Sequence, residues 1–241
     1  MAMPMSNMAG PPPGVLPPAA IGTSGLQYLA QMNEVRINQQ VEIAEVMTGI
    51  DMANRYQVLD GGNRLSYFVY EESECCNRVF CKENRGFIMH MMDNTNQEVL
   101  RMERIFRCCT GCCWFKSCGH ILDITANGVP LGLVRQSQYC LQPKLSIENS
   151  SGQELYHIEG PMCVCHGPCC FGDVPFNVFA SGSSAEPVAC ISRVHAGCAQ
   201  EMFSKANHFK IVYQQNLDLN SRALIFSATF LLDMMFFEHD K

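Results

Sequence analysis

Short runs in which apolar and polar residues alternate occupy most of the chain from Arg55 onward. In KLSIE, Leu145 and Ile147 fall on one face, and VLRMER (residues 99–104) alternates in the same way. Turn-forming Gly, Asn, Asp and Ser residues separate these runs at 60–63, 94–96, 127–128, 149–152 and 181–184. Alternation with period two indicates strands, and turns at this spacing indicate hairpins. The pattern predicts a mainly β protein with about a dozen antiparallel strands, closed into a barrel or sandwich.

The sequence also repeats itself. NQEVLRMERIFRCCTGCC, which starts at Asn96, aligns with GQELYHIEGPMCVCHGPC, which starts at Gly152, at an offset of 56 residues. A weaker third copy begins near Gly62, with Leu65 in the place of Val99. Such a repeat indicates one supersecondary unit used several times, here a hairpin followed by a cysteine-rich turn. Duplicated hairpins would place the cysteine turns at equivalent rims of a barrel.

The N-terminal 24 residues differ from the rest, because GPPPGVLPP and small residues cannot build a packed core. We expect a disordered, proline-rich arm over 1–24 that can contact partner proteins, and one folded domain over 25–241. GLQYLAQM (residues 25–32) predicts a short helix, and VRINQQ (residues 35–40) predicts a strand.

The C-terminal segment 222–237 is apolar on all sides, so a helix there must be buried in something. The apolar run from Ala223 to Phe237 would span about 22 Å at 1.5 Å per residue. A bilayer core is about 30 Å thick, and a spanning helix would also have to place Asp233 in lipid. The alternative is a helix that fills the interior of the barrel.

Composition excludes several classes of protein. The net charge is −6 and no basic run exceeds two residues, which argues against nucleic-acid binding. The chain has fifteen cysteines, but its first residues lack the features of a secretory signal, so we expect a reducing compartment with few disulfides. No nucleophile elbow, P-loop or HExxH motif is present, and no catalytic residue is assigned.

Several separated blocks resemble the phospholipid scramblase family: GLQYLAQMNEVRINQQVEIAEVMTGIDMANRYQVLD, DNTNQEV, ERIFRCCTGCC, GPMCVCHGPCCFGD and FLLDMMFFE. The resemblance implies a tubby-like fold, in which a twelve-stranded antiparallel barrel encloses the hydrophobic C-terminal helix. It also implies a protein of the cytoplasmic face of the plasma membrane that moves phospholipids between leaflets without ATP when calcium rises. A nuclear role known for the family has little support here, because the matching segment CISRVHAG is not basic.

Lipid attachment is what the resemblance implies for the first cysteine cluster, with palmitate on Cys108, Cys109, Cys112 and Cys113. Two or more acyl chains are needed for stable anchoring, and clustered cysteines meet that requirement. Unmodified turn thiols are one alternative. Zinc is the other, since Cys109, Cys113, Cys165 and Cys169 could supply four thiolates if the repeated turns lie close together.

Calcium is where the sequence departs from the family, which carries an acidic segment just before the C-terminal helix. The matching residues SKANHFKIVYQQ (204–215) contain two lysines and no acid. The remaining oxygen ligands would come from Asn207, Asn216 and Asp218, too few for strong binding of a hard cation. We therefore expect weak calcium binding in a phospholipid scramblase, or, alternatively, an acylated lipid-binding or adaptor module that does not scramble.

Overall fold

The computed structural model describes residues 25–40, 53–73, 85–106, 119–137, 142–162, 164, 172–183, 185–194 and 206–238. These residues form a short 3-10 helix η1 (Leu26–Gln31), twelve strands and the helix α4 (Leu219–Phe236). The strands are β1 (Glu34–Gln40), β2 (Arg55–Asp60), β3 (Leu65–Glu72), β4 (Phe87–Met92), β5 (Glu98–Arg104), β6 (Ile121–Ala126), β7 (Val129–Gln136), β8 (Lys144–Asn149), β9 (Glu154–Glu159), β10 (Val174–Ala180), β11 (Ala189–Arg193) and β12 (His208–Tyr213).

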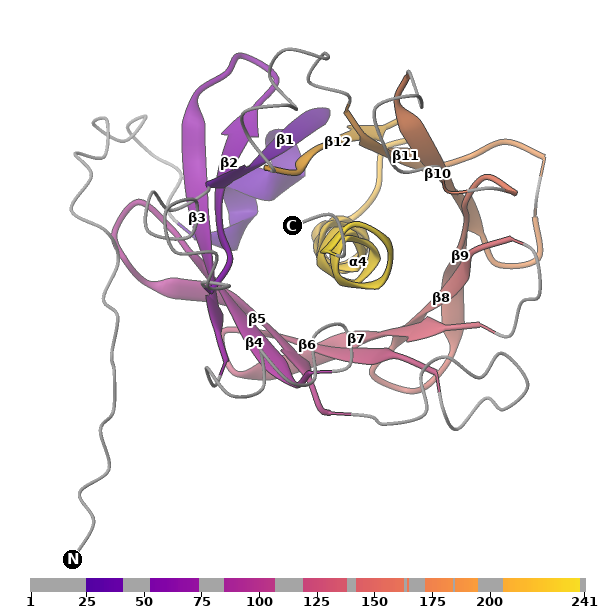
Figure 1. The fold of residues 1–241 in the computed structure, drawn as a ribbon, viewed down its shortest axis with the longest axis horizontal. Coiled ribbons are helices and arrows are strands. Elements are labelled where there is room, and N and C mark those ends of the chain that lie inside the picture. The colour runs from indigo at the N-terminus through magenta and orange to yellow at the C-terminus, as the bar shows by residue number, and fades with distance from the viewer. Residues whose placement is uncertain are drawn as a thin grey trace, which may run out of the picture.

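The strands form one closed barrel in which every neighbour in sequence is a neighbour in space. All pairs are antiparallel, and β1 closes the ring by pairing with both β2 and β12. Figure 1 shows the strands as a ring with α4 in its middle. The sequence-based expectation of a mainly β barrel around a hydrophobic C-terminal helix is confirmed.

Alternation along each strand decides which side chains enter the barrel. In β8, Leu145 and Ile147 are buried as the sequence predicts, and in β2 the buried positions are Tyr56, Val58 and Asp60. Because successive side chains of a strand point to opposite faces, one apolar face per strand is enough to line the interior.

The three repeat copies are hairpins with the same turn. In each one, a residue with positive φ occupies the fourth turn position: Asn63, Asn96 or Gly152. An Asp or Asn side chain at the start of each turn accepts hydrogen bonds from the backbone two and four residues later. The sequence alignment of the third copy is wrong by one residue. It paired Leu65 with Val99, but in the structure Leu65 is equivalent to Glu98, because each is the first strand residue after its turn.

The barrel has two different ends. The connections β2–β3, β4–β5, β6–β7, β8–β9 and β10–β11 lie at one end, together with η1 and the start of α4; we call this the hairpin end. The other six connections and the last turn of α4 lie at the opposite end, which we call the loop end. The segments of the sequence that connect strands at the loop end contain every cysteine except Cys190, which lies in β11.

Helix α4 begins at Leu219, three residues before the predicted start, because Asp218 is its N-cap and accepts a hydrogen bond from the Ser221 N–H at 3.4 Å. Among the described residues, α4 is the one helix long and apolar enough to cross a membrane, with a mean hydropathy of 1.2. Yet 78% of this helix is buried inside the protein. The structure therefore places the helix inside the barrel, one of the two environments that its sequence allows.

Candidate functional site

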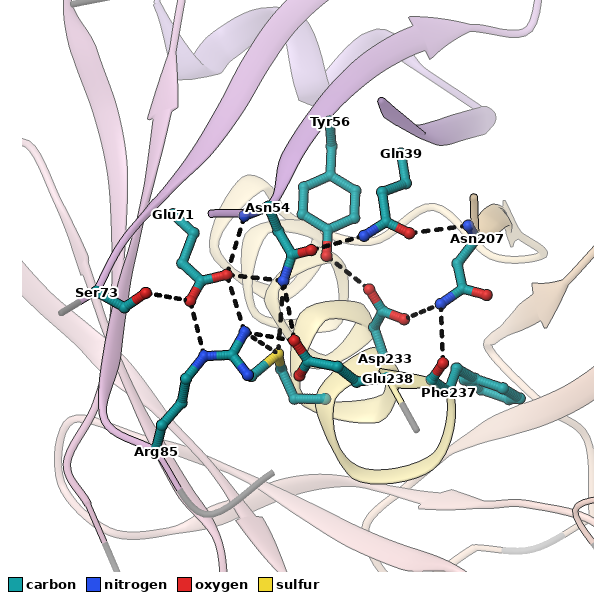
Figure 2. Close-up of polar contacts among 11 residues, drawn as sticks. Gln39, Asn54, Tyr56, Glu71, Ser73, Arg85, Asn207, Asp233, Phe237 and Glu238 are labelled. Atoms are coloured by element: carbon teal, nitrogen blue, oxygen red, sulfur yellow. Dashed lines mark hydrogen bonds and ion pairs between the residues drawn. The ribbon is translucent and has the colours of Figure 1, made fainter. Parts of the chain in front are cut away.

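A cluster of polar side chains surrounds the C-terminal half of α4 at the loop end (Figure 2). Six of its members lie at or beside the loop-end termini of β1, β2, β3 and β12, one precedes β4, and two come from α4 or the residues just after it. We call this set the clamp cluster: Gln39, Asn54, Tyr56, Glu71, Ser73, Arg85, Asn207, Asp233 and Glu238.

Arg85 is the cation of the clamp cluster, and its side chain has no exposed surface. Its Nε donates to Glu71 Oε1 at 2.9 Å and an Nη donates to Glu71 Oε2 at 3.1 Å. The same guanidinium contacts the carboxylate of Glu238, beyond the end of α4. Arg85 therefore joins β3 to the C-terminal end of the helix by a buried ion pair.

Glu71 is an ionised carboxylate in this setting. Burial acts to raise its pKa, but the Arg85 guanidinium and hydrogen bonds from Arg85, Ser73 and the Asn54 backbone outweigh burial and hold the pKa below its usual range. Ser73 donates to Glu71 Oε1 at 2.6 Å, and the Asn54 amide donates to Glu71 Oε2 at 2.7 Å. A buried carboxylate with this many donors favours the charged form.

Asp233 is the acidic residue on the helix itself. It accepts a hydrogen bond of 2.6 Å from the Tyr56 hydroxyl and one of 2.8 Å from the Asn207 side chain. Burial, together with the nearby Asp233 carboxylate, raises the pKa of Tyr56 well above its usual value, so the hydroxyl keeps its proton and acts as a donor. Asn207 also donates to the carbonyl of Phe237 at 3.2 Å, which satisfies an oxygen at the helix end.

Gln39 connects the two halves of the clamp cluster. Its amide donates to Asn54 Oδ1 at 2.7 Å, and its Oε1 accepts from the Asn207 backbone N–H at 2.9 Å. The cluster is thus continuous from β3 to β12 around the helix end. Breaking one partner would leave others buried without a hydrogen bond, which is costly.

The N-terminal end of α4 is fixed by another buried cation, Arg222. Its Nε donates to the Leu217 carbonyl at 3.0 Å, it contacts the Met32 carbonyl, and its guanidinium lies 4.5 Å from the centre of the Tyr213 ring. Polar contacts therefore hold both ends of α4, while its apolar middle packs against the barrel wall.

The cysteines singled out in the sequence lie outside the described residues. This applies to Cys108, Cys109, Cys112 and Cys113, and to the zinc candidates Cys165 and Cys169. The strands that flank both cysteine segments, β5 with β6 and β9 with β10, end at the same rim, as the repeat predicts. Within the described part of the chain, no group of three or more His, Cys, Asp or Glu side chains is arranged to hold a metal ion.

The three calcium candidates are distributed over both ends of the barrel. Asn207 precedes β12 at the loop end, where it is buried and bonded to Asp233 and Phe237. Asn216 and Asp218 are exposed and follow β12 at the hairpin end, where Asp218 caps α4. The length of β12 separates Asn207 from the other two, so Asn207 does not share a site with Asn216 and Asp218.

Sequence reasoning identified one member of the clamp cluster, Asp233, as an acid out of place in an apolar helix, but not its partners. Tyr56 carried a usable signal, since it alternates with the buried Val58 and so points inward. Arg85 carried none, because it lies outside the regular strands. Its contact with Glu238 joins positions 153 residues apart, which local patterns do not encode.

The family model described as Scramblase matches residues 13–239. The chain belongs to the Scramblase family. It is 37% identical to Phospholipid scramblase 1 of Homo sapiens over 215 residues, which are 89% of this chain and 66% of that relative.

Other scramblase relatives give similar values. Phospholipid scramblase 2 of Bos taurus is 36% identical over 94% of this chain and 75% of its own length. Phospholipid scramblase family member 5 of Homo sapiens is 34% identical over 89% of this chain and 78% of its own length. The chain spans about two thirds of the length of the first relative above. A solved LolA superfamily structure from Nitrosomonas europaea has a TM-score of 0.17 and 9% identity, too low to carry an argument.

Proposed function

We propose that this scramblase-family chain moves phospholipids between the two leaflets of a membrane, in both directions and without ATP. The observation that carries the proposal is the family match over nearly the whole described barrel, with relatives that are named phospholipid scramblases. Translocation requires no bond making or breaking. It requires a lower barrier for a polar headgroup that crosses hydrocarbon, where unsolvated polar groups are costly.

Liposomes that contain the purified protein and a fluorescent phospholipid in both leaflets test this function. Dithionite reduces the label in the outer leaflet only, so about half of the fluorescence should survive in protein-free vesicles. We expect a further protein-dependent loss, with no added nucleotide. Fluorescence that stays at the level of the protein-free vesicles would refute the proposal and favour a docked adaptor without scrambling activity.

Membrane residence, at the cytoplasmic face of the plasma membrane, comes in this proposal from palmitate on Cys108, Cys109, Cys112 and Cys113. The buried position of α4 supports it, because a helix clamped inside a barrel is not available to cross a bilayer. One acyl chain gives marginal binding and two give stable anchoring. Changing all four cysteines to alanine should move the protein to the cytosol in cell fractionation.

Cys190→Ala is the matched control, since Cys190 lies on β11 away from the cysteine segments and should leave the protein on the membrane. If the fourfold variant also stays there, the acyl anchor is refuted. Metal analysis of purified, unacylated protein tests the zinc alternative. One zinc per chain, lost on mutation of Cys109 and Cys165, would favour a zinc site over palmitate at the first cysteine cluster.

Calcium binding at the segment before α4 is weak in this proposal. Asn207 supports that view, since its side chain already bonds Asp233 and the helix end, which leaves Asn216 and Asp218 as oxygen ligands. Calcium takes six to eight oxygens, so two side chains imply millimolar affinity or worse. Isothermal titration should show no heat of binding in the micromolar range; a micromolar site that Asp218→Asn abolishes would contradict this.

A further inference from the structure

Large apolar side chains that remain in water are concentrated at the loop end. Four of them are exposed among the described residues: Ile105 at 54%, Phe106 at 53%, Val129 at 63% and Met162 at 75%. Ile105 and Phe106 follow the end of β5, and Met162 follows the end of β9, so three of these four lie at the loop end. Val129 begins β7 at the hairpin end, opposite to them.

The backbone holds both apolar pieces in place. A Cβ at Gly86 would lie 3.0 Å from the Phe106 nitrogen and 3.2 Å from the Arg104 carbonyl oxygen, so the chain at Ile105 and Phe106 packs directly on the start of β4. At the other piece, Gly160 donates to the Pro143 carbonyl at 2.9 Å, and its own carbonyl accepts from Gln142 at 2.7 Å. The chain is therefore held at Ile105 and Phe106 and, at the other piece, two residues before Met162.

The sequence next to these residues contains no acidic side chain. Residues 107–118 follow Phe106 directly and contain Arg107 and Lys116 but no acid, and residues 165–171 contain no acid either, although the whole chain has a net charge of −6. The hairpin end is different, because its turns are polar: Asp60 to Arg64, Asp93 to Gln97 and Asn149 to Gln153.

We propose that the loop end of the barrel is a lipid-docking surface, on which Ile105, Phe106 and Met162 insert their side chains into the bilayer. Two separated pieces on one rim suit a planar apolar surface such as a membrane, because both can enter it at once. Burial of exposed apolar side chains would drive the insertion. This docking rests on the proposed membrane function. It is a reversible contact that vesicle binding detects without acyl chains, whereas stable residence on cell membranes requires the acyl anchor.

Vesicle sedimentation of bacterially expressed, unacylated protein tests the surface, with vesicles of phosphatidylcholine that contain phosphatidylserine. Phe106→Asp and Met162→Asp should each lower the partition coefficient at least about tenfold, the factor expected when a large apolar side chain fails to leave water. Val129→Asp is the matched control and should bind like the wild type. Equal binding by all three variants, or no binding by the wild type, would overturn the proposal.

A second measurement does not depend on how well the Asp variants fold. With Trp114 replaced by Phe, a tryptophan introduced by Phe106→Trp should be quenched by brominated phospholipids, and one introduced by Val129→Trp should not. Equal quenching at both positions would refute a docked loop end. Binding through this end without lipid movement in the dithionite assay would refute scrambling alone, so failures of the two proposals are distinguishable.

Discussion

Replacing Arg85 with methionine removes the cation of the clamp cluster and keeps most of the side-chain volume. In the folded protein Arg85 and Glu71 are both fully buried and share two hydrogen bonds of 2.9 and 3.1 Å, and Arg85 also contacts Glu238. Removing one partner of a buried ion pair costs about 3–5 kcal/mol, because the remaining charge stays uncompensated. A domain of ordinary stability, about 5–15 kcal/mol, would lose a fifth or more of it.

The pH dependence gives the sharper test of Arg85→Met. In the wild type, the folded pKa of Glu71 lies below its unfolded value of about 4.3, so its contribution is present above about pH 4 and lost as pH falls. Without Arg85, burial raises the folded pKa above the unfolded value. The variant should then be most stable near pH 4–5 and lose stability as pH rises towards 7, the reverse of the wild type at this residue.

Urea unfolding followed by far-ultraviolet circular dichroism at pH 5 and pH 7 measures both effects. Adding Glu71→Gln to Arg85→Met should recover part of the loss at pH 7 and remove the reversed dependence on pH, because the double variant no longer buries the Glu71 charge. A loss below about 1 kcal/mol, the range of exposed ion pairs, would refute the reasoning. So would equal losses at both pH values.

Three smaller predictions follow from other contacts. Tyr56→Phe removes the donor to Asp233 and should cost about 1–3 kcal/mol by urea unfolding, since the carboxylate stays buried. Gly132→Ala should cost about 2 kcal/mol or more, because a Cβ there would lie 2.1 Å from the Glu148 carbonyl oxygen and φ is +156°. Asp93→Ala should lower the melting temperature more at pH 6 than at pH 3. Burial acts to raise the pKa of Asp93, but hydrogen bonds outweigh burial and hold this pKa below its usual value. The stability that the Asp93 carboxylate contributes is therefore lost as pH falls.

Each of these has its own check. Gly128→Ala is the control for Gly132, since nothing lies within 4 Å of a Cβ there and only the left-handed backbone is penalised, by about 1 kcal/mol. Equal losses at the two glycines would contradict the steric argument. A phenylalanine variant of Tyr56 as stable as the wild type would contradict the first prediction. A larger difference in melting temperature at pH 3 than at pH 6 would contradict the one for Asp93.

The sequence by itself determined the strands and hairpins of this protein. Alternation placed Leu145 and Ile147 on the buried face of β8, and the repeat located equivalent turns at Asn96 and Gly152, both of which have positive φ. These features are local, because a turn and the face of a strand depend on a few neighbouring residues. The alignment of the weakest copy was one residue out, although all three hairpins have the same register shift just before the turn.

Only the tertiary structure decided where α4 lies and what holds it. A barrel interior and a bilayer both exclude water, so the same apolar helix suits either, and its hydropathy cannot choose between them. The contacts of Asp233 with Tyr56 and Asn207 made the choice, because they give the one acid of the helix two donors inside the barrel. Tyr56 and Asp233 are 177 residues apart, and a pairing at that distance arises only when the barrel closes around the helix.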